Sequence, residues 1–469
     1  MTPRPSLQAI RERLIVALVV LLPLHALLVT VGTRLIAGPG HAPLPALALW
    51  KELVLVAILA LAAVEIWKIW RAGQRPACDL LDLLVVGFFA LAVGSAAWHG
   101  TATPKLLLGL RYDVLAPLAF VVLRHAPWSD WARSRLLWAL VWVGTAVAAI
   151  GLAGLVLPAS FFAALGYATD FHSLYLPDSP LAPFSQIGGT AIRRAQSTLS
   201  GPNQLGLWLI VPIGALLASA RRLGRARALA LGALLAAALA ATFSRTAWIG
   251  AVAGTLAIGA LQIGPRLARR WLLPVAGLLA AAVLVGVLAA PATIVRLSSS
   301  RGHFEQPLEA VHRLLAAPWG EGLASAGPAS SRFADACVML QPEDDPRWAA
   351  AQPELCVFLG DQQVQPTDRL CRCPFHPENW YLQIAVELGW PGLILWVGIL
   401  ALALWKLWPL ARAREPLGTA AAVALLGTAV GALFLHAWED TAVAFSVWIL
   451  VAVALQKGRN SAGEDHTNT

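Results

Sequence analysis

Two arginines stand directly before an apolar run in the stretch RRAQSTLSGPNQLGLWLIVPIGALLA, which covers residues 193–218. Arginine carries a planar, permanently charged set of donors that suits phosphate groups. Pro202 and Asn203 begin the apolar run, and the unpaired N–H groups at the start of a helix also favour an anion. Arg193 and Arg194 are therefore candidate phosphate ligands, with Asn203 as a supporting residue. The alternative is an anchor in which the arginine side chains reach lipid headgroups.

A third arginine lies between two later apolar runs, in TFSRTAWIG. A charge at membrane depth is costly and usually faces the interior of a helix bundle or a polar cavity. Arg245 is therefore another candidate phosphate ligand, with Ser244 as a hydrogen-bonding neighbour. A structural ion pair is the alternative for this arginine.

A third polar segment, HPENWYLQ, precedes a long apolar run that starts near residue 380. Its His376 and Glu378 are candidate general bases, since an imidazole or a carboxylate can take a proton from a hydroxyl group. Asn379 is a candidate supporting residue. Each also has a structural explanation: Glu378 in the first turn of a helix, Asn379 as the helix cap, and His376 as a loop residue.

The apolar runs that separate these segments predict an all-α polytopic membrane protein. The chain has 469 residues, of which 58% are hydrophobic and 13% charged, and its mean hydropathy is +0.67. Soluble globular proteins carry roughly 25% charged residues, so a soluble architecture does not fit. Runs of about 20 apolar residues cross a bilayer as helices, and continuous runs argue against a barrel. We expect about twelve spans, near residues 14–32, 47–67, 80–98, 105–123, 136–157, 203–220, 227–243, 246–263, 271–290, 380–404, 417–435 and 438–456.

The basic residues predict which side of the membrane each loop occupies. Lysine and arginine cluster at every second loop, and cytoplasmic loops are rich in these residues. Spans 1–9 therefore fall within residues 1–290, with an outer loop at about 158–202. A large outer loop follows at 291–379, then three spans within 380–456 and a cytoplasmic tail at 457–469. The basic cytoplasmic loops account for the net charge of +9, so no nucleic-acid partner is expected.

Four of the five cysteines lie in the large outer loop, namely Cys337, Cys356, Cys371 and Cys373. An exported loop meets an oxidising compartment, so two disulfides are expected, and four cysteines allow three pairings. Unpaired thiols and a zinc site are the alternatives, but the Cys371–Cys373 spacing is tighter than the usual zinc spacing. No aspartate-rich magnesium motif stands near the arginines, so no metal or other cofactor is expected.

Two further features of the large outer loop are predicted. Residues 303–316 place apolar side chains, among them Leu308 and Leu315, at helical spacing, which indicates an amphipathic helix at the outer membrane interface. The segment 341–374 is polar and rich in proline and aspartate. We expect it to be irregular and held by the disulfides.

In their order, the polar segments resemble those of the O-antigen ligase and polymerase superfamily of bacterial membrane glycosyltransferases. The tract from Arg194 to Asn203 is similar to the family's arginine, small residues and Pro-Asn, and Ser244-Arg245 is like its Ser-Arg pair at the head of a span. HRLLAAPWGEGLASAG (312–327) resembles the family's Pro and Gly-x-Gly pattern in the large loop. ENWYLQIAVELGWPGL (378–393) resembles its Asn-x-x-Leu and Glu-x-Gly-x-x-Gly segment, and WKELVL is a weaker match.

The resemblance covers about residues 190–400 and implies transfer of a glycan from undecaprenyl diphosphate to an acceptor, at the periplasmic face of the inner membrane and without a metal. It implies that Arg194 and Arg245 hold the donor diphosphate. The family commonly places its base, a histidine, directly before the asparagine, whereas Glu378 stands there in this chain and His376 lies two residues earlier. Lipid A–core is the favoured acceptor, and the alternatives are another repeat unit, as in a polymerase, or a protein hydroxyl group.

Two other classes of protein fit parts of the pattern. A transporter or flippase also has about twelve spans, but such proteins often show two similar halves and a site at the membrane midplane, which the sequence lacks. A non-catalytic assembly subunit related to the enzymes is the second alternative. The replacement of the family's histidine by Glu378 keeps that alternative open.

Overall fold

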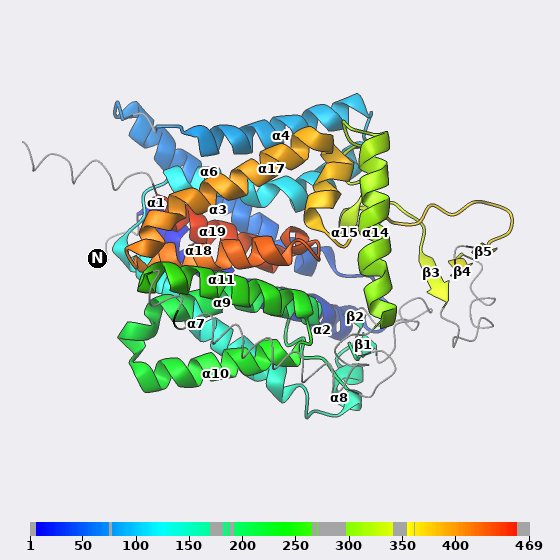
Figure 1. Ribbon diagram of the computed structural model, residues 1–469, viewed down its shortest axis with the longest axis horizontal. Coiled ribbons are helices and arrows are strands. Elements are labelled where there is room, and N and C mark those ends of the chain that lie inside the picture. The colour runs from blue at the N-terminus through cyan, green and yellow to red at the C-terminus, as the bar shows by residue number, and fades with distance from the viewer. Residues whose placement is uncertain are drawn as a thin grey trace, which may run out of the picture.

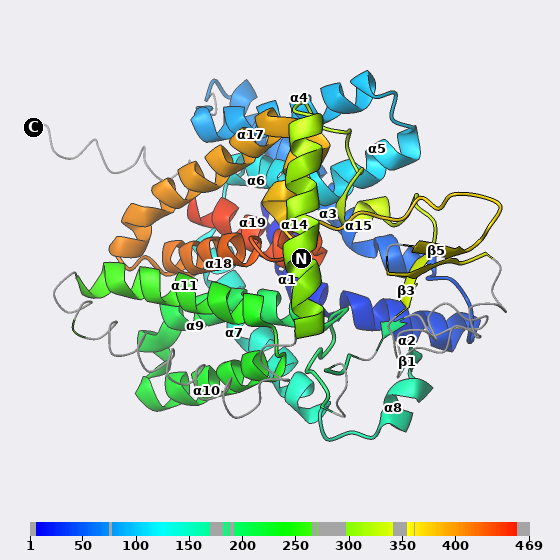
Figure 2. The ribbon, with the colours of Figure 1, turned by 45° about the vertical axis from the view of Figure 1, so that its right-hand side comes forward.

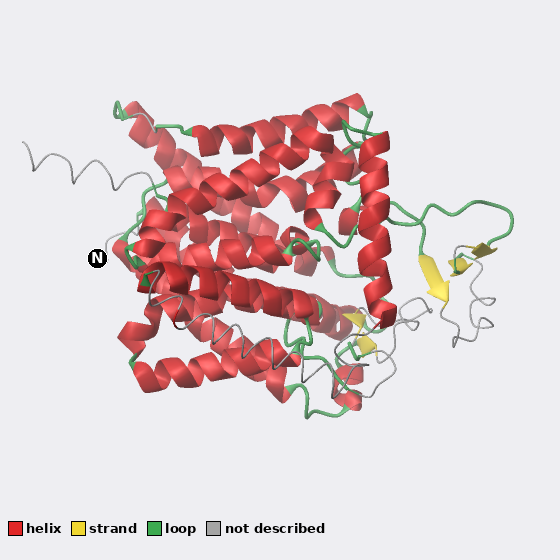
Figure 3. Ribbon diagram, in the orientation of Figure 1, coloured by secondary structure: helices red, strands yellow, loops and turns green. Residues whose placement is uncertain are grey.

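The computed structural model describes residues 6–74, 77–168, 182–183, 185–187, 192–264, 270, 297–340, 354–360 and 362–456. Within these residues the chain forms a helical bundle with two small sheets (Figures 1 and 3). The α-helices are α1 (Leu7–Leu21), α2 (His25–Ala37), α3 (Pro45–Arg71), α4 (Leu80–Trp98), α5 (Thr103–Gly109), α6 (Leu115–His125), α7 (Asp130–Ala153), α8 (Ala159–Ala164), α9 (Pro202–Leu223), α10 (Arg225–Ala241), α11 (Arg245–Ile263), α14 (Leu297–Ala316), α15 (Gly327–Ser330), α17 (Trp380–Arg412), α18 (Pro416–Gly431) and α19 (Thr441–Ala454). The strands are β1 (Tyr167–Ala168), β2 (Ala182–Pro183), β3 (Cys337–Leu340), β4 (Cys356–Leu359) and β5 (Gln362–Gln365).

Eight helical segments of the described chain are long and apolar enough to cross a membrane. They are Leu7–Ala37, Pro45–Arg71, Leu80–Trp98, Thr103–His125, Asp130–Ala153, Pro202–Leu223, Arg245–Ile263 and Trp380–Arg412. The shorter helices α10, α18 and α19 lie beside them in the bundle, at three other predicted spans (Figure 1). The predicted span at 271–290 lies outside the described residues. This mostly helical structure agrees with the expected class of polytopic membrane protein.

Some predicted spans begin or end at other residues. The first span, predicted at 14–32, extends from Leu7 to Ala37. The last two, predicted at 417–435 and 438–456, are α18 and α19, and residues 432–440 between them form a turn that contains a short 3₁₀ helix, Ala437–Glu439. The turn ends where the Asp440 carboxylate accepts the Val443 N–H at 3.0 Å and caps α19. The sequence predicted a break between these spans at residues 436–437, and the turn in the structure is longer.

The bundle has two ends, because successive long helices run in opposite directions (Figure 1). One end carries the starts of α3, α9, α11 and α17, together with α8, α14 and both sheets, and we call it the loop end. The opposite end carries the start of α1, the end of α19 and the described basic loops, and we call it the basic end. The arrangement agrees with the predicted alternation of basic loops along the sequence.

Helix α14 lies crosswise over the loop end, as Figures 1 and 2 show. Its Ala310 and Leu314 are buried toward the bundle, whereas Leu308 and Leu315 are 58% and 63% exposed. The helix was predicted at 303–316 and begins earlier, at Leu297. It therefore has one face on the bundle and an apolar stripe that the protein leaves uncovered.

At the basic end, some of the predicted topological arginines are buried in ion pairs. Arg11 donates to Glu65 at 3.0 Å, and Arg124 donates to Asp79 at 2.9 Å and to Asp82 at 3.0 Å. Removal of one partner would leave the other charge buried and unpaired, which is strongly destabilising. These arginines therefore tie neighbouring helices together and do not merely mark a side of the membrane.

Helix α18 lies inside the bundle, in contact with α9, α11, α17 and α19. Small residues allow a close approach: a Cβ atom at Gly250 of α11 would lie 2.4 Å from the carbonyl oxygen of Gly427 in α18. A Cβ atom at Gly214 of α9 would lie 2.9 Å from the carbonyl oxygen of Ala420. Such small-residue contacts are typical of packed membrane helices. They fix α9 and α11 against the helix that leads into the turn 432–440.

Two disulfides hold the sheet of β3, β4 and β5. Cys337 is bonded to Cys373, and Cys356 to Cys371. Strand β3 pairs with β4 in parallel, and β4 pairs with β5 in antiparallel orientation. The segment 341–374 was expected to be irregular, but it contains β4 and β5. The sequence did not reveal these strands because each has four residues, too few for a clear alternating pattern.

Replacement of Cys356 and Cys371 by serine is expected to loosen the sheet and leave the bundle folded. The cross-link joins cysteines 15 residues apart, and the chain-entropy estimate for such a loop is about 3 kcal/mol. Limited proteolysis should cut the variant faster within residues 354–373, while its helical circular dichroism signal on heating stays that of the wild type. Cys78→Ser, which removes an exposed free thiol, is the control. Equal cleavage rates in variant and wild type would contradict the prediction.

Candidate functional site

Arg194 lies against the turn that joins α10 to α11. Its Nε donates to the carbonyl oxygen of Thr242 at 2.8 Å, and its guanidinium also donates to Asn203 Oδ1 at 2.8 Å. The N–H of Ala195 donates to the carbonyl oxygen of Ala241 at 2.8 Å. Side chain and backbone therefore fix the Arg194 tract to the start of α9 and to the α10–α11 turn, where the second predicted segment lies.

Arg245 is the first residue of α11, and Ser244 occupies the cap position before it. The Ser244 hydroxyl does not cap the helix; it is buried and makes no hydrogen bond to the described residues. A Cβ atom at Gly206 of α9 would lie 2.6 Å from the Cβ atom of Ala247, so α9 packs tightly on this helix start. Both predicted arginine segments thus lie where helix N–H groups favour an anion.

Arg193 and Arg194 contact different parts of the protein. Its guanidinium donates to the carbonyl oxygen of Leu157 and lies over the Phe162 ring, 6.0 Å from the ring centroid. The backbone here is extended and forms a β-bridge with Gln186, and neighbouring side chains of an extended chain project to opposite sides. Arg193 therefore contacts α8 and the connection before it, which favours Arg194 over Arg193 as a phosphate ligand; the role of Arg193 as a third ligand stays a prediction.

The HPEN segment meets the turn 432–440 where α17 begins. The Asn379 side chain accepts the Leu382 N–H at 3.0 Å and so caps α17, and its Nδ2 donates to the carbonyl oxygen of Leu433 at 2.8 Å. The N–H of Trp380 donates to the carbonyl oxygen of Ala432 at 2.9 Å. Asn379 therefore has the capping role that the sequence suggested, and it also ties the segment to the turn.

His376 lies beside a second histidine, His436 of the turn. Its Nε2 is 3.0 Å from the Ser331 hydroxyl oxygen, and the centroids of the two imidazole rings are 6.1 Å apart. Burial lowers the pKa of His376, and burial together with the neighbouring His376 lowers the pKa of His436 to about 4. Both imidazoles are therefore neutral at pH 7 and weaker bases than an ordinary histidine.

Glu378 has the properties expected of a general base. Burial raises the pKa of its carboxyl group to about 7, close to the pH at which general base catalysis is most efficient. Its backbone φ is +52°, a left-handed conformation that residues other than glycine rarely adopt and that is often found at active sites. Of the two bases considered from the sequence, these properties favour Glu378 over His376.

The turn 432–440 and the preceding Gly431 join the three segments. A Cβ atom at Gly431 would lie 2.7 Å from Leu207 Cδ2 in α9 and 3.7 Å from Thr246 Cγ2 in α11. The turn also binds the start of α17 through the Asn379 and Trp380 hydrogen bonds. Helices α9 and α11 therefore pack on the glycine before this turn, and the HPEN segment is bonded to the turn itself.

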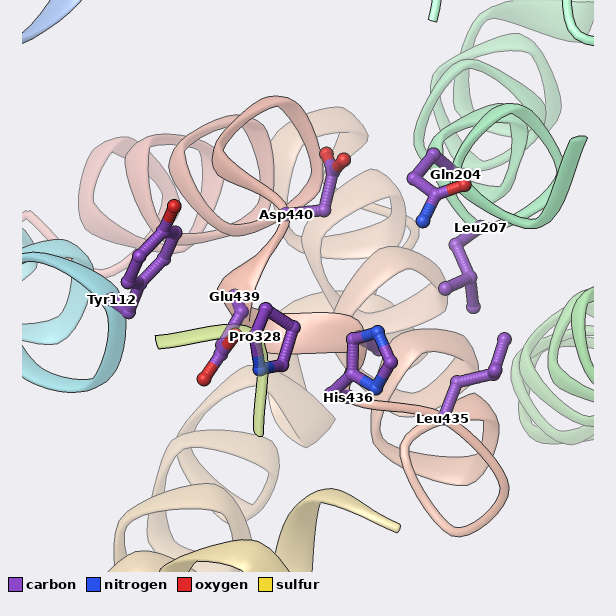
Figure 4. A pocket seen from close by; sticks show the side chains of 9 residues that line it. Tyr112, Gln204, Leu207, Pro328, Leu435, His436, Glu439 and Asp440 are labelled. Atoms are coloured by element: carbon purple, nitrogen blue, oxygen red, sulfur yellow. The ribbon is translucent and has the colours of Figure 1, made fainter. Parts of the chain in front are cut away.

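A cavity of about 180 Å³ lies beside this turn (Figure 4). It is lined by Tyr112, Gln204, Leu207, Pro328, Leu435, His436, Ala437, Glu439 and Asp440. Glu439 is buried and its Oε2 has no hydrogen-bond partner among the described residues, and burial raises the pKa of its carboxyl group. The sequence analysis singled out none of these residues, although the signal was present: HAWED (436–440) is a polar interruption between two apolar runs.

A second cavity, of about 270 Å³, adjoins Arg194. Most of its wall is apolar and comes from α7, α8 and their connection, with Ile150, Leu155 and Phe161 among the lining residues. Arg194 therefore lines an apolar cavity, while its guanidinium donates to the polar α10–α11 turn. Such an arrangement suits a ligand with a hydrocarbon chain and an anionic head.

Two carboxylic acids are buried within candidate spans. Asp113 lies in a π-helical turn, Leu110–Val114, and Glu387 lies in α17. Glu387 Oε1 accepts the Ala326 N–H at 3.3 Å, and the two carboxyl groups act on each other electrostatically. Ionisable groups inside spans and π-helical turns are both frequent at functional sites. The sequence analysis did not single out Asp113 or the side-chain role of Glu387.

Two groups of side chains in the described chain are close enough to hold a metal ion, and both have other partners. One is Cys78, Asp82 and His125 at the basic end, where Asp82 already binds Arg124. The other includes Cys356 and Cys371, which are bonded to each other. Neither group lies at the candidate site.

Comparison with known proteins assigns neither a family nor a function to this chain. Protein-family models give no match to this chain, and a search of curated proteins finds no relative. The function is therefore argued from the geometry of the site.

Proposed function

We propose that this chain is a membrane glycosyltransferase of the O-antigen ligase type, which moves a glycan from undecaprenyl diphosphate to an acceptor, with lipid A–core favoured. One observation carries the proposal: Arg194 donates to the carbonyl oxygen of Thr242, three residues before Arg245. Guanidinium groups on adjoining segments can together offset the charge of a leaving diphosphate. The apolar cavity beside Arg194 supports a donor that carries a lipid chain.

The proposed reaction is a direct displacement at C1 of the donor sugar. Glu378 takes the proton of the acceptor hydroxyl group as its oxygen bonds to C1, and the bond from C1 to the diphosphate oxygen breaks. The leaving undecaprenyl diphosphate keeps the bonding electron pair, and Arg194 and Arg245 offset its charge. The pKa of about 7 at Glu378 supports this role, since the ionised carboxylate is then well populated at neutral pH.

The proposal includes a topology in the bacterial inner membrane. The chain has twelve spans, both termini are cytoplasmic, and the loop end faces the periplasm. The positive-inside bias of the basic loops supports this orientation. Helix α14 then lies at the outer interface, which the exposed Leu308, Leu315 and Trp319 support, because apolar and tryptophan side chains are favoured at that depth.

Deletion of the gene, followed by inspection of surface glycans, tests the proposal. Loss of polymer from lipid A, with the lipid-linked glycan accumulating, is the expected result for a ligase. Single repeats that remain attached to lipid A would indicate a polymerase, and loss of a glycosylated protein alone would indicate a protein glycosyltransferase. Unchanged glycans in the deletion strain, with the protein present in the parent strain, would contradict all three.

A transporter is the second candidate, and the buried Asp113 and Glu387 favour it. Acidic residues inside spans are often part of ion or proton pathways. The purified chain in liposomes distinguishes the two classes. Movement of a lipid-linked glycan across the bilayer without formation of a new glycosidic bond would support transport, whereas transfer to an acceptor would support the enzyme.

A further inference from the structure

The cavity beside the turn 432–440 has a different chemistry from the arginine segments. Its polar lining consists of a phenol, an amide, an imidazole and the two carboxyl groups of Glu439 and Asp440. No lysine or arginine lines it, although Lys51 acts electrostatically on Asp440, and Arg111 and Arg332 act on Tyr112. A wall with two acids and no cation disfavours a phosphate, because it offers the anion no opposite charge in contact. The same groups suit hydroxyl groups, which both donate and accept hydrogen bonds.

The walls of the cavity come from opposite sides of the site. Figure 4 shows Gln204, Leu207 and Leu435 on one side, Tyr112 and Glu439 on the other, and His436 and Pro328 between them. Polar residues from several elements therefore surround a small volume, with apolar carbon surface among them, and the Glu439 carboxyl group is directed away from it, toward Gln383. A sugar ring presents the matching surface, with hydroxyl groups at its rim and C–H groups on its faces.

The cavity also lies next to the arginine segment along the chain. Gln204 lines the cavity, and the preceding residue, Asn203, accepts a hydrogen bond from Arg194 at 2.8 Å. The first turn of α9 thus separates a cationic region from an acidic one. A reaction that expels a diphosphate and consumes a hydroxyl group needs these two environments side by side.

We infer that this cavity binds the uncharged sugar ring that carries the acceptor hydroxyl group, with Tyr112, Gln204 and Asp440 holding its other hydroxyl groups. The inference rests on the proposed transferase function and adds the place and chemistry of the acceptor. Neutral His436 is suited to such a ring, since an uncharged imidazole both donates and accepts. The diphosphate remains on the arginine side of α9.

Steady-state transfer by the full-length chain in nanodiscs tests this inference, with an undecaprenyl-diphosphate-linked O-antigen repeat as donor and lipid A–core as acceptor. Tyr112→Phe, Gln204→Leu and Asp440→Asn should each raise KM for the acceptor about 10-fold, the usual effect of one lost hydrogen bond to a charged or well-placed group. KM for the donor should change less than 2-fold. Asp440→Asn keeps the α19 cap, because asparagine caps helices as well as aspartate does.

Asp130→Asn, an exposed carboxylate on α7 at the basic end, is the matched control and should leave both KM values unchanged. Unchanged acceptor KM in all three cavity variants, or an equal rise in donor KM, would overturn the inference. Arg194→Ala in the same assay separates the inference from the proposed function. If Arg194→Ala has lost transfer and the three cavity variants show wild-type KM values, the transferase stands and the acceptor site is wrong. If the wild type transfers nothing, both are wrong.

Discussion

Replacement of Arg194 or Arg245 by alanine is expected to lower kcat for glycan transfer by about 100- to 1,000-fold, the usual cost of removing one group that stabilises charge in a transition state. The charge on the leaving diphosphate develops as the bond to C1 breaks, so the loss should fall mainly on kcat. The measurement is transfer by the purified variants in nanodiscs. Membrane insertion and the thermal unfolding profile serve as checks of folding.

Arg193→Ala is the matched control for this pair. Its guanidinium binds the carbonyl oxygen of Leu157 and lies over Phe162, so its removal should lower kcat far less than removal of its neighbour. Arg194→Lys should recover only part of the activity, because lysine cannot reproduce two simultaneous bonds to Thr242 and Asn203. Full activity in both Arg194→Ala and Arg245→Ala would remove the basis for a diphosphate site.

Replacement of Glu378 by glutamine is expected to lower kcat/KM by about 100- to 10,000-fold, since general base catalysis contributes factors of that size. Glutamine keeps the shape of the side chain and cannot accept the proton. In the wild type, the base is active when ionised, so kcat/KM should rise with pH up to about 7, the pKa of Glu378, and level off above it. This rise should be absent from the residual activity of Glu378→Gln.

Two variants test whether Glu378 or His376 is the general base. Glu378→His should restore part of the transfer that Glu378→Gln loses, because an imidazole at this position is again a base. His376→Asn should change kcat/KM much less, since burial lowers the pKa of His376 and its Nε2 is engaged with Ser331. If His376→Asn abolishes transfer and Glu378→Gln does not, the two assignments must be exchanged.

Several site residues were placed correctly from the sequence because local chemistry controls them. Asn379 caps α17 as its position before the apolar run suggests, and Arg245 stands at the start of α11. The amphipathic helix in the large loop was also predicted, and it is α14. In each case neighbouring residues decide the outcome, through helix caps and helical spacing.

Other features of the site could be recognised only from the tertiary structure. Adjacent arginines of similar chemistry, Arg193 and Arg194, have separate partners because the extended backbone projects them to opposite sides. Glu439 fell within a predicted span and His436 in the short gap before that span, since a short polar interruption barely alters a long apolar run. The choice between Glu378 and His376 depends on burial, which the sequence does not report.

By itself, the sequence determined that this chain is built from long apolar helices, because a backbone in hydrocarbon must satisfy its own hydrogen bonds and helices do so locally. Only the tertiary structure decided which polar residues meet. Arg194 meets Thr242, and Asn379 meets the turn 432–440, across long separations in the chain, and these contacts depend on how α9, α11 and α17 pack around α18. That packing rests on close contacts of small residues such as Gly250 and Gly427, and the energy of such contacts depends on surfaces that exist only once the helices have assembled.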